Sequence, residues 1–222
     1  MKKLLLALLF LASSASSQTV IKIKHQRYTT AYNTQLNYPI LVTWKITAAN
    51  VCRKGTAGYV SRDSSRFVPD PRIPGLTNLQ QYYDKDNPFN PHKWQRGHNC
   101  PANDNSCSKV QMDECHYFSN MTPQNASLNE HRWALLEAYA SKLAKRTTVR
   151  VWCGSYGEIE KMGAVSVPKY CWKILKYGTS EEVYIFPNVD TVMRHPYGYY
   201  KQPTAAGVAR IRDSTGLLLR NL

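Results

Sequence analysis

Residues 94–137 constrain the fold of this chain more than any other stretch, because they end in a helix that residue chemistry can place. Ser127 followed by Glu130 and an apolar run has the form of a capping box, with Ser127 as the N-cap. The apolar residues that follow recur at helical spacing: Trp133, Leu136, Ala140 and Leu143. The pattern predicts a helix with one buried stripe.

This helix would carry two polar residues toward a histidine. Asn129 falls in its first turn, and Glu137 falls two turns later, about 12 Å farther along the axis and on the flank of the stripe. His98 precedes the helix in the chain. An imidazole, an amide and a carboxylate placed in this way can converge on one metal ion and one phosphate.

Three blocks of the same stretch resemble one known family. They read Gln-Arg-Gly-His at 95–98, Asn-Met-Thr-Pro-Gln at 120–124, and Asn129 with Trp133 and Leu-Glu at 136–137. In this order and with these gaps they are similar to the sugar-nonspecific DNA/RNA endonucleases of the ββα-metal (His-Me finger) superfamily. The resemblance covers roughly residues 40–222 and implies a ββα-metal active-site motif.

The remaining pattern predicts an α+β fold. β-Branched and aromatic runs indicate strands at 40–46, 147–152, 170–175 and 182–188, and a short helix is expected at 204–212, stopping near Gly216. Residues 20–24 alternate and read as an edge strand or a leader. Because helices do not alternate regularly with strands, the central sheet should be mainly antiparallel, within a single domain.

The N-terminus reads as a secretory signal peptide. Two lysines precede an apolar run at 4–12 and a small-residue tail at 13–17. We expect cleavage before Gln18, a nuclease-like domain at 18–222, and a secreted protein, extracellular or periplasmic. The apolar run is too short to span a bilayer, and no other stretch is long enough, so no membrane anchor is expected.

Charge points to polyanionic partners. The formal net charge is +14, or +12 once Lys2 and Lys3 leave with the signal peptide. A field of this sign attracts nucleic acid, and DNA and RNA are the expected substrates. Basic secreted proteins also bind cell walls or heparin, so charge alone does not identify the partner. The sequence leaves protein partners unknown.

Six cysteines remain after cleavage: Cys52, Cys100, Cys107, Cys115, Cys153 and Cys171. An even count behind a signal peptide predicts three disulfides, and the six allow 15 pairings, among which the sequence does not choose. Disulfides formed by the three cysteines between His98 and Asn120 would hold the active-site loop in place. The alternative is a zinc site formed by the cysteines of that loop with His116, which the spacing favours less because no C-x-x-C pair is present.

His98 is the candidate general base, since imidazole titrates near neutrality and can take a proton from water. Most single histidines are structural or lie at the surface, but the flanking Arg-Gly and the downstream blocks favour catalysis here. Asn129 is the candidate direct ligand of Mg²⁺, with Mn²⁺ or Ca²⁺ possible, because an amide oxygen is a hard neutral donor. Glu137 is implied by the resemblance to hold metal-bound waters.

The other candidate site residues are an amide and three arginines. Asn120 would orient His98 or a substrate oxygen. The family uses an upstream arginine on the phosphate, and Arg62 is preferred to Arg66 for this role. Arg96 would make a second phosphate contact, and a structural salt bridge is an equal alternative. Gln95 stands where many relatives have Asp, which leaves open what orients the turn around His98.

These observations predict a secreted, divalent-metal-dependent endonuclease. It would hydrolyse phosphodiesters in DNA and RNA with little sequence preference, because no base-reading motif is present and dispersed Lys and Arg contact only the backbone. One alternative is a nucleotide pyrophosphatase/phosphodiesterase of the same superfamily. Another is a catalytically silent polyanion-binding protein.

Overall fold

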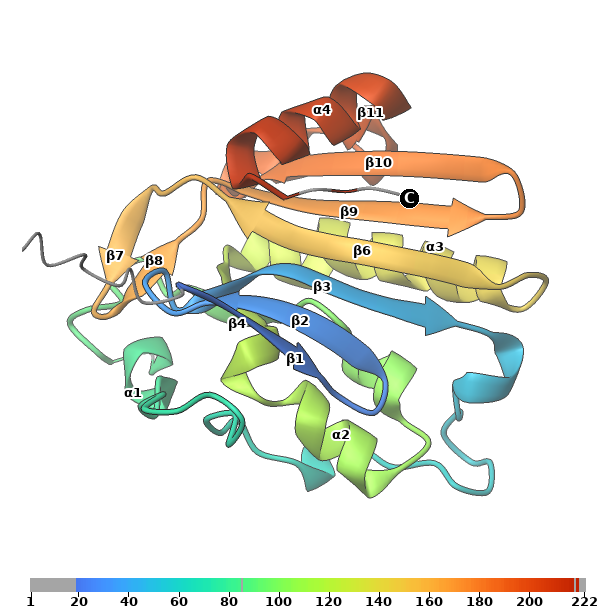
Figure 1. The fold of residues 1–222 in the computed structure, drawn as a ribbon, viewed down its shortest axis with the longest axis horizontal. Helices are drawn as coiled ribbons and strands as arrows, with labels where there is room; N and C mark the ends of the chain where they lie inside the picture. Colours follow the sequence, from blue (N-terminus) through green and yellow to red (C-terminus); the bar gives the residue numbers. More distant parts are fainter. Residues whose placement is uncertain (1–18, 85, 218, 220–222) are drawn as a thin grey trace, which may run out of the picture.

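A seven-stranded antiparallel sheet forms the centre of the computed structural model, which describes residues 19–84, 86–217 and 219 (Figure 1). The strand order is β1-β2-β3-β6-β9-β10-β11. The strands are β1 (Val20–Lys24), β2 (Tyr28–Asn33), β3 (Tyr38–Ile46), β6 (Val149–Tyr156), β9 (Tyr170–Tyr177), β10 (Ser180–Pro187) and β11 (Lys201–Gln202). The predicted α+β class and antiparallel sheet are confirmed, and each predicted strand is present.

Two two-stranded antiparallel sheets and four α-helices are the other main elements of the described structure. These sheets pair β4 (Gln95–His98) with β5 (Met121–Gln124) and β7 (Glu160–Met162) with β8 (Val165–Val167). The helices are α1 (Gln80–Tyr83), α2 (Lys109–Cys115), α3 (Ala134–Ala144) and α4 (Thr204–Thr215). As expected, α4 stops at Gly216, whose φ of 69° is the left-handed conformation of a helix C-cap. Within the described ranges, no helix has the length and apolarity needed to cross a bilayer.

The sheet is covered on both faces, and strand alternation decides which side chains face which helix. In β9, Cys171 and Leu175 join the core cluster that includes residues of α3, whereas Trp172 and Ile174 join the cluster that includes Ile211 of α4. The two helices lie on opposite sides of the sheet (Figure 1). The same alternation places Lys173 on the α3 face, inside the core.

The helix begins earlier than the capping-box prediction, which was wrong. Ala126 and Ser127 are already helical, and the Asn125 side chain accepts a hydrogen bond from Ser127 N at 2.9 Å. Ser127 has helical dihedrals and makes no side-chain capping bond. Asn125 therefore caps the helix, because an Asn side chain can serve the second free N–H of a helix as well as a Ser can. Glu130 instead accepts from Gln95 Nε2.

The expectation of three disulfides is also corrected. One bridge is present among the described cysteines, Cys52–Cys107, with a Cα–Cα distance of 5.0 Å. The other four are buried thiols: Cys100, Cys115, Cys153 and Cys171. Cys153 and Cys171 lie on adjacent strands but face Lys173 and Ser155 respectively, so they are out of register for a bridge. The predicted signal peptide at 1–17 lies outside the described residues.

Candidate active site

A cavity of about 930 Å³ brings together most of the predicted site residues. It lies between β4, the start of the long helix and the loop before α1. Its lining includes five of the candidates, from three separate segments of the chain: Arg62, Arg96, His98, Asn129 and Glu137. The convergence expected from the spacing of the three blocks is therefore present in the fold.

The two-stranded β4–β5 sheet holds His98 at the cavity wall. His98 pairs with Met121 and Gly97 with Thr122. A Cβ at Gly97 would lie 2.0 Å from Gln124 Oε1, so only glycine lets the buried Gln124 side chain cross β4. Trp133 Nε1 donates to the carbonyl oxygen of His98 at 3.0 Å, which ties the end of β4 to the helix.

The surroundings of the His98 imidazole favour its neutral form. Its Nε2 is inaccessible to solvent and has no hydrogen-bond partner among the described residues. The ring lies 5.6 Å from that of Phe67 and 4.9 Å from that of His116, measured between centroids. Burial lowers the pKa of His98 well below 6.5, and the positive potential of His116, Arg62 and Arg96 lowers it further. A neutral imidazole is the form that can accept a proton.

A π-helical segment, Leu128–Trp133, opens the long helix and carries Asn129. In a regular α-helix, the side chains of two residues eight positions apart point in directions that differ by about 80° around the helix axis. A π turn contains more residues than an α turn, so each residue advances by a smaller angle. The angle between Asn129 and Glu137 is therefore smaller, and the two side chains lie closer to one face of the helix. This segment explains why both residues line the cavity although Glu137 was expected on the flank.

Gln95 fixes the orientation of Asn129. Gln95 Oε1 accepts from Asn129 Nδ2 at 2.7 Å, and Gln95 Nε2 donates to Glu130. Because the amide nitrogen of Asn129 is engaged in this bond, its carbonyl oxygen is the atom left to bind a cation. The open question about the residue before Arg96 thus has a structural answer: Gln95 connects β4 to the first turns of the helix.

Glu137 is paired with a lysine in the core. Lys173 Nζ lies 3.2 Å from Glu137 Oε1, and the lysine side chain is only 1% exposed against 22% for the glutamate. The ammonium also lies 4.0 Å from the ring centroid of Trp133 and 5.7 Å from that of Trp44. Burial raises the pKa of Glu137, and the charge of Lys173 opposes this rise.

A second carboxyl group belongs to the same electrostatic environment. Asp104 Oδ2 accepts from Trp44 Nε1 at 2.8 Å. Burial raises the pKa of Asp104 to about 6, and the negative charge of Glu137 adds to the rise, whereas the Trp44 bond and Lys173 oppose it. The positive charge of Lys173 therefore opposes the rise in pKa of two carboxyl groups, those of Glu137 and Asp104.

The arginines differ in their surroundings. Arg62 lies in a short 3₁₀ turn and is exposed at the cavity, whereas Arg66, although also exposed, is not among the residues that line it. Arg96 is half-buried, with its guanidinium carbon 4.5 Å from the Phe67 ring centroid and Nη1 2.8 Å from Gln80 Oε1. Burial lowers the pKa of Arg96. Arg62 is thus free to reach a ligand, while Arg96 is held in place.

Asn120 is not part of the cavity wall. Its side chain is fully buried, accepts from Cys100 N at 2.9 Å, and donates to the carbonyl oxygens of Cys100 and Cys115 at 2.8 Å each. These bonds hold the chain that follows His98 against the end of α2. Asn120 therefore supports the loop behind His98, rather than contacting a substrate oxygen.

The donors present at the cavity suit a hard divalent cation. Asn129 offers a neutral amide oxygen and Glu137 a carboxylate, both oxygen donors of the kind that Mg²⁺, Mn²⁺ and Ca²⁺ prefer. Two protein oxygens leave most of the coordination sphere to water and phosphate, which is usual for Mg²⁺. The site fits the metal class that the sequence predicted.

Sequence reasoning missed Lys173 and the role of Gln95. The sequence does indicate Lys173, because this residue alternates with Cys171 and Leu175 in a predicted core strand. Its side chain should therefore point to the same buried face as theirs. A lysine at an inward position of a strand indicates a buried partner. Gln95 gave no comparable signal, because its partners become adjacent only when β4 packs against the helix.

Comparisons with known proteins agree with this geometry. A family model described as DNA/RNA non-specific endonuclease matches residues 10–217. Nuclease EXOG, mitochondrial, from Xenopus laevis is 34% identical over 110 residues, which are 49% of this chain and 29% of that protein. Nuclease C1 from Cunninghamella echinulata var. echinulata is 29% identical over 150 residues, 59% of this chain and 56% of that protein.

A solved structure gives the same fold. EndoG, in a crystal structure of its complex with EndoGI, matches with a TM-score of 0.74 and 24% identity, covering 89% of this chain and 84% of that one. This likeness is one of fold. The matched segments span only about a third to just over half of the length of the Xenopus and Cunninghamella proteins.

Proposed function

Because the chain belongs to the DNA/RNA non-specific endonuclease family, we propose that it is a divalent-metal-dependent endonuclease that hydrolyses phosphodiester bonds in DNA and RNA with little sequence preference. The observation that carries this proposal is the convergence of His98, Asn129, Glu137 and Arg62 on one cavity. Phosphodiester hydrolysis needs a base for water, positive charge for the transition state and help for the leaving oxygen.

The residues divide these tasks by their chemistry. His98, held neutral, takes a proton from the attacking water. Arg62, exposed at the cavity, grips phosphate oxygens with its guanidinium, and the fixed Arg96 adds positive charge beside it. Asn129 and Glu137 would hold Mg²⁺ or a similar cation, directly and through water respectively, and that ion would supply charge stabilisation to the phosphate and leaving oxygen.

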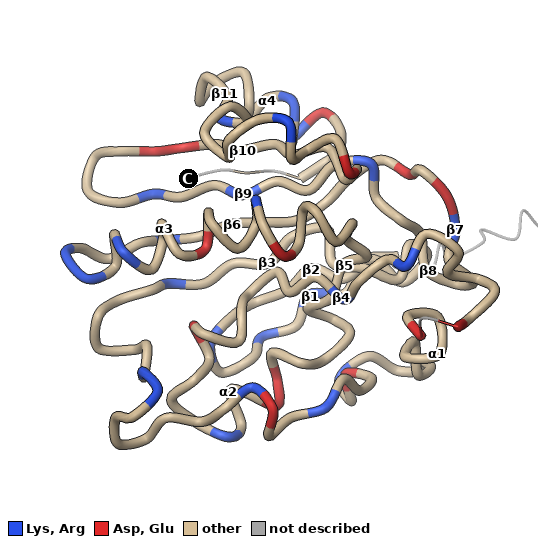
Figure 2. Tube along the Cα trace, turned by 180° about the vertical axis from the view of Figure 1, so that it is seen from behind, with Lys and Arg blue, Asp and Glu red and all other residues tan. Residues whose placement is uncertain are grey.

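The charge distribution favours a polymeric substrate read through its backbone. Lys and Arg positions are spread over α3, α4 and the loops near α2, with Asp and Glu positions between them (Figure 2). Dispersed cations neutralise phosphates without reading base edges, so we expect cleavage to depend strongly on salt and weakly on sequence.

The test is digestion of plasmid DNA and of RNA by the oxidised mature protein, in Mg²⁺ and in EDTA. The proposal expects both polymers to be degraded only with the metal. A folded protein that cleaves neither polymer with Mg²⁺, Mn²⁺ or Ca²⁺ would leave the polyanion-binding alternative. Cleavage of dinucleotides and nucleotide diphosphates but of neither polymer would instead favour the pyrophosphatase/phosphodiesterase.

Gln95 should control metal use through its hydrogen bond to Asn129. Replacing Gln95 by Ala removes the bond that fixes the amide of Asn129. Loss of a residue that orients a metal ligand typically weakens metal affinity by about 10–100-fold. We expect Gln95→Ala to need correspondingly more Mg²⁺ for half-maximal rate, with most of the rate recovered at saturating Mg²⁺. A rate lost at all Mg²⁺ concentrations would contradict this role. Gln35→Ala, the same substitution at an exposed position outside the cavity, is the control.

The pH profile should reflect the lowered pKa of His98. The neutral imidazole is the active form, and its pKa lies well below 6.5 in the folded protein, so the base stays neutral as the pH falls through 6.5. We expect kcat/KM at constant ionic strength to hold from neutral pH down past this value and then to fall. An acidic limb centred above 6.5 would contradict the proposed environment of His98.

We further propose that the protein is exported. The predicted signal peptide and the Cys52–Cys107 bridge support this, since disulfides persist in oxidising compartments. Several relatives are named mitochondrial, so the alternative is a mitochondrial leader. N-terminal sequencing of protein recovered from culture medium should give Gln18 first. Recovery only from the cell interior would reject export.

A further inference from the structure

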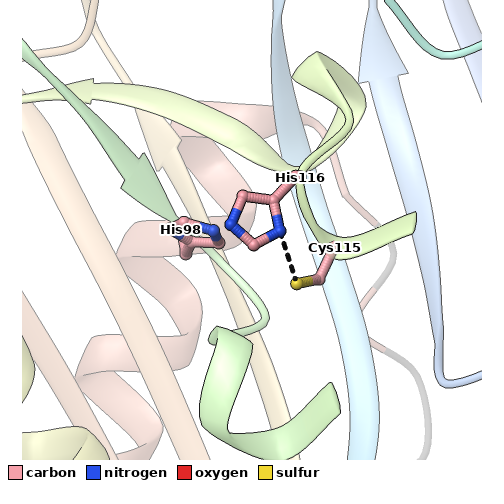
Figure 3. Close-up of side chains that lie close together, drawn as sticks. All are labelled: His98, Cys115 and His116. Atoms are coloured by element: carbon pink, nitrogen blue, oxygen red, sulfur yellow. Dashed lines mark hydrogen bonds between the residues drawn. The ribbon is translucent and has the colours of Figure 1, made fainter. Parts of the chain in front are cut away.

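Three metal-ligating side chains meet beside the cavity, outside the oxygen donors already described. They are His98 from the end of β4 and Cys115 with His116 from the end of α2. One ligand atom from each lies within 4.8 Å of the other two. In Figure 3 the imidazoles of His98 and His116 point toward each other, and Cys115 Sγ lies beside them.

The chemistry of this set differs from that of Asn129 and Glu137. Two imidazole nitrogens and a thiolate sulfur are the ligands that zinc takes in proteins, whereas Mg²⁺ and Ca²⁺ take oxygen. Three such ligands with one position left for water is a common zinc arrangement. Zinc bonds of about 2.0–2.3 Å would place the ligand atoms roughly 3.3–3.8 Å apart, so the side chains must close by about 1 Å.

The surroundings also suit a bound ion. Cys115 and His116 are 0% and 2% exposed, and His98 Nε2 is a solvent-inaccessible nitrogen without a partner among the described residues. The Phe67 ring walls the cluster, 5.0 Å from that of His116 and 5.6 Å from that of His98. Buried ligands of this kind exclude competing water, and an unpartnered buried nitrogen gains a partner when a metal binds.

From this geometry we propose that His98, Cys115 and His116 form a zinc site, and that zinc bound there inhibits the enzyme. Binding forms one Zn–S and two Zn–N bonds, and the thiol proton of Cys115 passes to solvent. With zinc on one ring nitrogen and a proton on the other, the His98 imidazole has no lone pair left to accept a proton from water, so zinc and catalysis exclude each other. The inhibitory part rests on the proposed function, while binding itself does not.

The test uses Co²⁺ in place of zinc, because the absorption spectrum of bound Co²⁺ shows whether a sulfur atom is among its ligands. The wild-type protein, with Cys52–Cys107 intact, should bind one Co²⁺ with a sulfur-to-cobalt charge-transfer band that Zn²⁺ abolishes. Cys115→Ser keeps a hydroxyl that can donate to Met112 O, as the thiol does at 3.2 Å. It should lose the band and bind Zn²⁺ more than about 100-fold less tightly, since losing even a partner that only orients a ligand costs about 10–100-fold.

Cys171→Ser, at another buried thiol, is the matched control and should behave as wild type. With Mg²⁺ in excess, micromolar Zn²⁺ should inhibit wild type and Cys171→Ser but not Cys115→Ser. Absence of the band in wild type, or its loss in both variants, would overturn the site. A band without inhibition of an active enzyme would overturn the inhibitory role. A band in a protein with no nuclease activity would support the site while refuting the proposed function.

Discussion

Replacing Lys173 by Met is expected to destabilise the protein by about 3–5 kcal/mol, the usual effect of removing one partner from a buried ion pair. Lys173 Nζ lies 3.2 Å from Glu137 Oε1 and is almost fully enclosed. Met keeps the packing of the lysine stem against the Trp133 and Trp44 rings but removes the charge. Glu137, which is only 22% exposed, then lacks a neighbouring cation, and the raised pKa of Asp104 loses an opposing charge.

The sign of the pH dependence follows from the same pair. Burial already raises the pKa of Glu137, and loss of Lys173 raises it further. A carboxyl group with a raised folded-state pKa destabilises the fold above that pKa and not below the unfolded value. The deficit of Lys173→Met should therefore be largest near neutral pH and shrink as the pH falls and Glu137 becomes protonated.

Urea unfolding monitored by tryptophan fluorescence measures this deficit. Lys45→Met, at an exposed position of β3, is the matched control and should change stability by no more than about 0.5 kcal/mol. Adding Glu137→Gln to Lys173→Met should recover part of the loss, because the unpaired charge is gone. A deficit below about 1 kcal/mol, or one that grows at low pH, would show that the pair is not held as described.

The sheet and the convergence of the site could be predicted because they follow from local pattern. The strand at 40–46 and the helix ending at Gly216 have strong periodicity and turn chemistry of their own. The three blocks fix the order and spacing of His98, Asn129 and Glu137. In these segments, local preference and tertiary structure agree.

The predictions were wrong where the local sequence is compatible with two conformations and tertiary contacts determine which of them forms. Asn125 and Ser127 are both good caps, and the Gln95–Glu130 contact draws Glu130 away from the box that Ser127 would need. The cysteine count carries no information on register, which separates Cys153 from Cys171. Residue propensities do not indicate the π turn at 128–133, so regular helical spacing placed Glu137 on the flank of the stripe, farther around the helix from Asn129 than it lies.

Replacing His98 by Ala is expected to lower kcat for plasmid and RNA cleavage by about 10²–10⁴-fold, the usual contribution of a general base. The fold should persist, because the bond from Trp133 Nε1 is accepted by the backbone oxygen of residue 98, which Ala retains. The substitution also removes a ring whose Nε2 has no hydrogen-bond partner in the described structure, so it leaves no buried polar group without its partner.

Two further measurements separate a base from a merely structural histidine. His131→Ala, at an exposed position of the π segment, should retain wild-type rates and serves as the control. Exogenous imidazole should restore part of the rate of His98→Ala, because the cavity left by the ring can admit it, and the restored rate should follow the concentration of neutral imidazole. Loss of rate without rescue, together with lower stability in urea, would mean that His98 acts through packing, and the water would then need another base among the residues that line the cavity.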